Sequence, residues 1–118
     1  MIKIRRVYEH AEVTDGTRIL VDRMWPRGIR RNTPNVDVWI RDIAPTVELR
    51  KWFAHDPAKW VGFKSRYMAE LENNKAIVHL LQVIRSTDPV TLVYASKDEA
   101  RNNAVVLREF LKRKFKIE

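Results

Sequence analysis

Residues 22–28 contain the side-chain types that bind anions and react with them. Arg23 and Arg27 lie on either side of Trp25, and Asp22 precedes them at the predicted end of a strand. A guanidinium group matches phosphate and carboxylate groups and stacks on indole rings. We therefore expect Arg23, Trp25 and Arg27 to bind a ligand and Asp22 to be a catalytic acid or base. The alternative is that Trp25 packs as a lid and that Asp22 and Arg23 form an ordinary ion pair.

A second polar segment, residues 96–103, follows the apolar run 90–95. Ser96 and Glu99 have the spacing of a capping box, which predicts a helix that begins almost directly after a strand. The N-terminus of a helix presents free N–H groups and attracts anions. The predicted site residues here are Lys97, Asn102 and Asn103 for binding and Asp98 for catalysis. The alternative is a helix capped by its own acidic residues, without a ligand.

Two further residues extend the predicted site. Asp42 is predicted to bind the ligand as a carboxylate partner of Asp22, although a loop role explains it as well. His55 is predicted to act in acid–base catalysis, while its neighbour Asp56 is better explained as the N-cap of a helix. A single histidine without a second ligand at a suitable spacing does not predict a metal site. No cofactor is indicated.

Several familiar motifs are absent from the sequence. It has no phosphate-binding P-loop, no G-x-G-x-x-G, no G-x-S-x-G elbow and no H-E-x-x-H zinc motif. It also has no cysteine, which excludes disulfides, thiolate metal sites and cysteine nucleophiles.

The elements that must position these residues are short strands separated by helices. Strands are predicted over residues 2–7, 17–22 and 90–95, and residues 38–40 form a further short strand or a turn. Helices are predicted over residues 46–53 and then after Asp56, where apolar residues recur at helical spacing. The apolar faces of the two middle helices contain Trp60, Phe63, Tyr67 and Leu71 in one and Ile77, Leu80, Leu81 and Ile84 in the other.

This pattern predicts the fold class. Buried strands that are separated by helices cannot form a hairpin, so they should be parallel. We expect one compact three-layer α/β domain over residues 1–118, with a small, mostly parallel sheet flanked by helices, Rossmann-like in a loose sense. Ligands of open α/β sheets bind beyond the carboxyl ends of the strands. Both polar segments are predicted to meet at that edge.

Composition and charge indicate the class of protein, its cellular location and the kind of partner it binds. Of 118 residues, 45% are hydrophobic and 32% charged, which is typical of one globular domain. No apolar run is long enough to span a membrane or to act as a signal peptide, so we expect a cytoplasmic protein without a membrane contact. Lys and Arg number 23 against 15 Asp and Glu, and the net charge of +8 favours anionic partners.

Four segments together resemble a known family. Residues 21–28, 39–45 and 49–57, and residues 92–98 together with 102–104, are similar to the uncharacterised YeaO-like family, also described as domain of unknown function 488. The resemblance implies a small α/β domain over nearly the whole chain. It does not identify an activity. It adds weight to His55, which belongs to one of these segments.

Three functions are consistent with the sequence. The first is a site for a small anionic ligand, phosphorylated or nucleotide-like, in a hydrolase or transferase. The second is a nucleic-acid-binding module that uses exposed tryptophans and the basic C-terminal residues Lys112, Arg113, Lys114 and Lys116. The third is a regulatory protein, such as a homodimer, without chemistry. The first predicts that the polar segments converge in one pocket.

Overall fold

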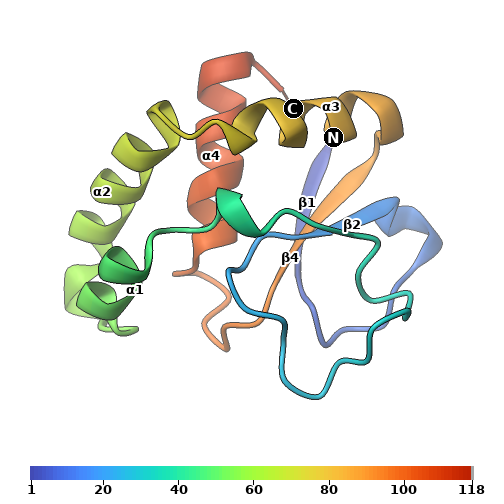
Figure 1. The fold of residues 1–118 in the computed structure, drawn as a ribbon, viewed down its shortest axis with the longest axis horizontal. Helices are drawn as coiled ribbons and strands as arrows, with labels where there is room; N and C mark the ends of the chain where they lie inside the picture. Colours follow the sequence, from blue (N-terminus) through green and yellow to red (C-terminus); the bar gives the residue numbers. More distant parts are fainter. Residues whose placement is uncertain (118) are drawn as a thin grey trace.

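A computed structural model describes residues 1–117 of the chain. Its elements, with 3-10 helices marked η, are β1 (Ile2–Arg6), η1 (Val13–Asp15), β2 (Thr17–Leu20), β3 (Val38–Trp39), η2 (Arg41–Ile43), α1 (Val47–Phe53), η3 (Pro57–Lys59), α2 (Trp60–Glu72), α3 (Ala76–Thr87), β4 (Val90–Tyr94) and α4 (Asn103–Phe115). Figure 1 shows the helices gathered beside the strands.

The four strands form one parallel sheet in the order β1-β4-β2-β3. Strand β4 is buried along its whole length and lies between β1 and β2. Leu92 of β4 is opposite Ile4 on one side and Ile19 on the other. The predicted α/β domain with a parallel sheet is therefore confirmed. Because all strands run the same way, their carboxyl ends share one edge.

The sheet is the middle of three layers. Side chains such as Ile19 and Leu92 point to one face, where residues of all four α-helices complete the main core. Leu20 and Val93 point to the other face and pack against side chains of the long connection between β2 and β3. Irregular chain, not helix, therefore forms the third layer.

The predicted helices occur where apolar residues recur at helical spacing. Phe63, Tyr67 and Leu71 are buried along α2, and all four predicted apolar residues of α3 are buried. Thr46 caps α1 by accepting a hydrogen bond from the Leu49 N–H, at 3.2 Å. The predicted N-cap Asp56 accepts one from the N–H of Ala58 at the start of η3.

Replacing Tyr67 with phenylalanine is expected to lower the free energy of unfolding by about 1–2 kcal/mol. The Tyr67 hydroxyl is fully buried and donates to the Ile43 carbonyl at 2.6 Å, which ties α2 to η2. Its loss leaves that carbonyl without this donor. Tyr8→Phe is the matched control, because the exposed Tyr8 hydroxyl donates to the Arg27 carbonyl at 2.8 Å. Urea denaturation measures both, and an equal loss in the two variants would contradict the argument.

The predicted start of the last helix is wrong. Ser96 and Glu99 do not form a capping box, since α4 begins at Asn103 and residues 95–102 form a loop. Inside this loop Asp98 accepts hydrogen bonds from the N–H groups of Ala100 and Arg101, both at 2.9 Å, and so closes a turn. The true N-cap is Asn102, whose amide oxygen accepts from the N–H of Val105 at 3.0 Å.

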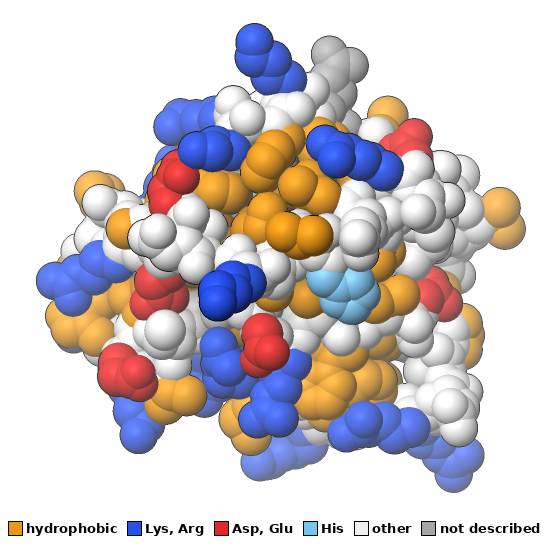
Figure 2. Space-filling model, turned by 45° about the horizontal axis from the view of Figure 1, so that its top comes forward, with side chains coloured by type: hydrophobic (Ala, Val, Ile, Leu, Met, Phe, Trp, Pro, Cys, Tyr) orange, Lys and Arg blue, Asp and Glu red, His pale blue; other side chains and the backbone are white. Residues whose placement is uncertain are grey.

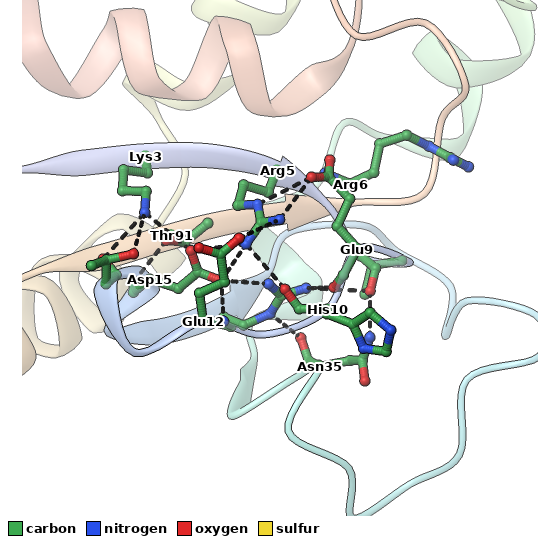
Figure 3. Close-up of polar contacts among 12 residues, drawn as sticks. Lys3, Arg5, Arg6, Glu9, His10, Glu12, Asp15, Asn35 and Thr91 are labelled. Carbon is green, nitrogen blue, oxygen red and sulfur yellow. Dashed lines mark hydrogen bonds and ion pairs between the residues drawn. The ribbon is translucent and has the colours of Figure 1, made fainter.

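A buried ionic cluster lies on the face of the sheet opposite the helices (Figure 3). Asp15 and Arg18 are 0% and 1% exposed and are joined by a 2.7 Å hydrogen bond. Arg5 and Lys3 of β1 reach the same carboxylate at 2.8 and 3.1 Å. Thr91 of β4 donates to the Asp15 carbonyl at 2.7 Å. The cluster therefore connects β1, β4 and β2.

Candidate functional site

A cavity of about 750 Å³ opens at the carboxyl edge of the sheet. The segments that follow β1, β2 and β4 and the end of α1 contribute to it. The structure brings nine of the ten predicted site residues to this cavity, namely Asp22, Arg23, Trp25, Arg27, His55, Lys97, Asp98, Asn102 and Asn103. The tenth, Asp42, is outside the lining, with a side chain that is 85% exposed and 3.9 Å from Arg23.

Asp22 follows the buried end of β2 and is held on both carboxylate oxygens. The N–H of Ala95 donates to Oδ2 at 2.9 Å, and the amide of Asn103 donates to Oδ1 at 3.1 Å. Burial raises the pKa of Asp22, while these hydrogen bonds and the charges of Arg50 and His55 act in the opposite direction. A raised pKa brings a carboxyl group nearer to the pH range of general acid–base chemistry.

The two predicted asparagines, Asn102 and Asn103, form hydrogen bonds with protein groups around the cavity. Asn103 also donates to the Val21 carbonyl at 3.0 Å, so it fastens the start of α4 to the end of β2. Asn102 caps α4 and donates to the Asp98 carbonyl at 3.0 Å. Their amide groups therefore position Asp22 and the 95–102 loop.

Positive side chains outnumber negative ones around the cavity. Its lining contains five cationic side chains, Arg23, Arg27, Arg50, Lys97 and Arg101, against the carboxylates of Asp22 and Asp98. Within residues 1–117, Arg27, Arg50 and Lys97 form no ion pair. These three charges are free to bind an anion.

The other two cations are engaged with the protein. Arg23 donates to the carbonyls of Pro45 and Ala44 at 3.2 and 3.1 Å, which fastens the chain after β2 to the start of α1. Arg101 pairs with Asp98 at 3.2 Å. The hydrogen bonds from the N–H groups of Arg101 and Ala100 lower the pKa of Asp98. A half-exposed carboxylate with a lowered pKa is a poor proton donor, and the contacts of Asp98 are those of a loop residue.

Aromatic side chains form the apolar wall of the cavity. Phe53 and Phe63 are buried and stacked, with ring centroids 4.3 Å apart. After α1 the chain turns through left-handed conformations at Ala54 and His55, with φ of 47° and 57°. This turn places the exposed His55 at the cavity, with its ring 6.1 Å from that of Phe53.

Trp25 lines the cavity and is also part of the smaller core. Its indole N–H donates to the Ile29 carbonyl at 2.7 Å, and its ring meets Trp39 edge-on at 5.5 Å. The guanidinium of Arg31 lies 4.3 Å from its ring centroid. Trp25 therefore packs against the smaller core and also lines the cavity.

Several residues that line the cavity carry no site prediction from the sequence: Tyr8, Arg50, Phe53, Phe63 and Arg101. Arg50 is the most consequential, because α1 contributes it to the cavity as a cation without an ion pair among residues 1–117. Its only signal was its place in the family-like segment 49–57. For Arg101 the sequence offers a local indication, because it follows Asp98 by three residues, a spacing at which the two side chains can form an ion pair.

Two kinds of feature are absent from the described residues. Among residues 1–117, no group of three or more His, Asp or Glu side chains lies close enough together to hold a metal ion. In the same part of the chain, no helix has the length and apolar character needed to cross a membrane.

The fold and the cavity together define a small single-domain α/β protein with a cationic pocket at the carboxyl edge of a parallel sheet. The chain belongs to the family described as the inactive DUF488-N3 subclade, whose sequence pattern matches residues 1–118. The expected resemblance to the uncharacterised YeaO-like family is confirmed.

Two relatives illustrate this membership. The uncharacterised protein YeaO of Escherichia coli is 40% identical over 111 residues, which cover 94% of this chain and 96% of that protein. An uncharacterised protein of Mycobacterium tuberculosis is 41% identical over 110 residues, covering 93% of this chain and 92% of the relative. No solved structure is significantly similar to the chain.

Proposed function

We propose that this protein binds a small anionic ligand, phosphorylated or nucleotide-like, in the cavity at the carboxyl edge of its sheet. The observation that carries the proposal is the convergence of Arg27, Arg50 and Lys97, from three distant segments and without ion pairs among residues 1–117, around one cavity. Guanidinium and ammonium groups bind phosphate strongly. The cavity volume of about 750 Å³ is in the range of small-molecule sites.

The surroundings of these charges support binding of an anion. The stacked Phe53 and Phe63 make one wall apolar, and an apolar wall strengthens the attraction between an anion and nearby cations. The hydrolase or transferase activity is a finer hypothesis, with Asp22 and His55 as its acid–base residues. The family's description as inactive favours binding without turnover. The proposal places the protein in the cytoplasm, where phosphorylated metabolites are abundant.

The alternative of a nucleic-acid-binding module has less support. It requires a continuous positive surface, whereas Figure 2 shows one face on which apolar and acidic side chains separate the Lys and Arg side chains. In the basic C-terminal segment, Arg113 pairs with Glu109 at 2.7 Å and Lys114 with Glu72 at 2.9 Å. These pairs reduce the charge offered to a polyanion. The homodimer stays a prediction.

Replacing Arg50 with alanine is expected to weaken anion binding about tenfold or more, since a charged hydrogen bond contributes roughly 1.5–3 kcal/mol. Isothermal titration calorimetry with inorganic pyrophosphate and a ribonucleoside 5′-monophosphate measures the change. Arg85→Ala is the matched control, because Arg85 is an exposed arginine at the end of α3, outside the cavity.

Two results would contradict the proposal. The first is equal affinity in the Arg50→Ala and Arg85→Ala variants. The second is binding only to oligonucleotides, lost in high salt whatever their sequence, which would identify the basic surface as the functional feature.

A further inference from the structure

We propose that the ligand is a phosphorylated ribose, either free or as part of a nucleotide, whose hydroxyl groups donate to Asp22. This inference rests on the proposed anion site and names the chemistry of its ligand. It makes Asp22 a residue that determines specificity.

The first argument comes from the bonding capacity of Asp22. A carboxylate has two oxygens and about four acceptor positions. Protein donors occupy one position on each oxygen, through the N–H of Ala95 and the amide of Asn103. These two bonds fix the carboxylate at the cavity and leave acceptor capacity for a ligand. Only a donor group satisfies that capacity, and a phosphate oxygen beside Asp22 would be repelled.

The second argument comes from the arrangement of charge. Arg27 and Lys97 have exposed side chains at the cavity, whereas Asp22 is partly buried between the ends of β2 and β4. A ligand that satisfies both therefore has an anionic group and, a few bonds away, hydroxyl donors. The phosphate and the ring hydroxyls of a ribose phosphate have this relation. At the carboxyl ends of α/β strands, acidic side chains bind ribose hydroxyls in the same way.

The third argument comes from the size of the cavity and its apolar wall. A volume of about 750 Å³ is far larger than a single phosphate group requires. Phe53 and Phe63 line the same cavity and give a carbon skeleton apolar surface to contact. An inorganic anion would leave this surface unused.

Calorimetric titration of the wild-type protein tests the inference directly. The probes are inorganic phosphate, ribose 5-phosphate, adenosine 5′-monophosphate and its 2′,3′-dideoxy analogue. We expect adenosine 5′-monophosphate to bind about tenfold or more tightly than the dideoxy analogue, and ribose 5-phosphate to bind more tightly than inorganic phosphate. The comparison of ribose 5-phosphate with the nucleotide shows which source the site prefers.

The Asp22→Asn variant supplies the second test. The substitution removes the negative charge and offers an amide in place of one acceptor oxygen, so the preference for the hydroxylated nucleotide should disappear while phosphate affinity is kept or increased. Asp88→Asn is the control, because Asp88 is an exposed aspartate at the opposite edge of the sheet. If Asp22→Asn fails to fold, the wild-type comparison decides alone.

The outcomes separate this inference from the proposed function. Equal binding of the nucleotide and its dideoxy analogue, with the dependence on Arg50 retained, would overturn the ribose assignment and leave the anion site standing. Absence of binding by all four probes would overturn both.

Discussion

Replacing Asp15 with asparagine is expected to lower the free energy of unfolding by about 3–5 kcal/mol, the usual cost of breaking a buried ion pair from one side. Asp15 accepts from Arg18, Arg5 and Lys3, and its carboxylate is fully buried. Arg18 is buried too, and the remaining donors of its guanidinium bind backbone carbonyls, including that of Asn35 at 2.8 Å. Without Asp15, the buried guanidinium of Arg18 has no ion-pair partner within residues 1–117.

Asp88→Asn is the matched control for this substitution. Asp88 pairs with the N-terminal ammonium group at 2.6 Å, but both groups are exposed, and exposed ion pairs contribute about 0–1 kcal/mol. Urea denaturation of both variants gives the comparison. A loss below about 1 kcal/mol for Asp15→Asn would show that the buried cluster contributes little to stability.

The same cluster predicts how stability depends on pH. Hydrogen bonds from the N–H of Glu12 and from the side chains of Lys3, Arg18 and Arg5 outweigh burial and lower the pKa of Asp15. A lowered pKa in the folded protein means that the contribution is complete above the unfolded value, near 3.9, and is lost as the pH falls below it. We therefore expect stability to decrease below about pH 4, and to decrease less in Asp15→Asn.

Replacing Gly16 with alanine is expected to cost about 3 kcal/mol or more, the sum of backbone strain and overpacking. Gly16 has φ of 62° and ψ of −140°, a conformation that is essentially restricted to glycine. A Cβ at this position would lie 2.0 Å from the carbonyl oxygen of Pro89 and 2.7 Å from its carbonyl carbon. Because the obstacle is backbone, no side-chain movement relieves the clash.

Gly28→Ala separates the two contributions. Gly28 also has a positive φ, of 83°, but a Cβ there would meet nothing within 4 Å. Only the conformational cost remains, about 1–2 kcal/mol. Thermal and urea denaturation of the two variants compare them, and equal losses would mean that the approach of Gly16 to Pro89 is unimportant.

Asp15 and Gly16 lie in the connection that carries the chain from β1 past β4 to β2. Gly16 allows this connection to pass close to the start of β4, and Asp15 joins it to side chains of β1 and β2. The opposite ends of the same strands form the cavity. These two residues thus contribute to the alignment of strand ends that the candidate site requires, without contacting the cavity.

The sequence alone determined the elements and their directions. Buried strands are predicted over residues 17–22 and 90–95 and occur over Thr17–Leu20 and Val90–Tyr94, and the helices between them require a parallel sheet. The polar segments after those strands had to meet at one edge, and all eight residues predicted in these two segments line the cavity. These conclusions depend on periodicity, caps and chain connectivity, which are local properties of the sequence.

Only the tertiary structure decided how distant segments combine. It placed β4 between β1 and β2, brought Arg50 of α1 to the cavity, and enclosed Asp15 with Arg18 under the sheet. At the start of α4 it selected Asn102 as the cap, because Asp98 closes a turn earlier in the loop. The strand order and the place of Arg50 depend on packing between parts of the chain that no local pattern relates. The sequence therefore predicts a candidate site at the strand ends, and the tertiary structure determines which charged side chains line the cavity there.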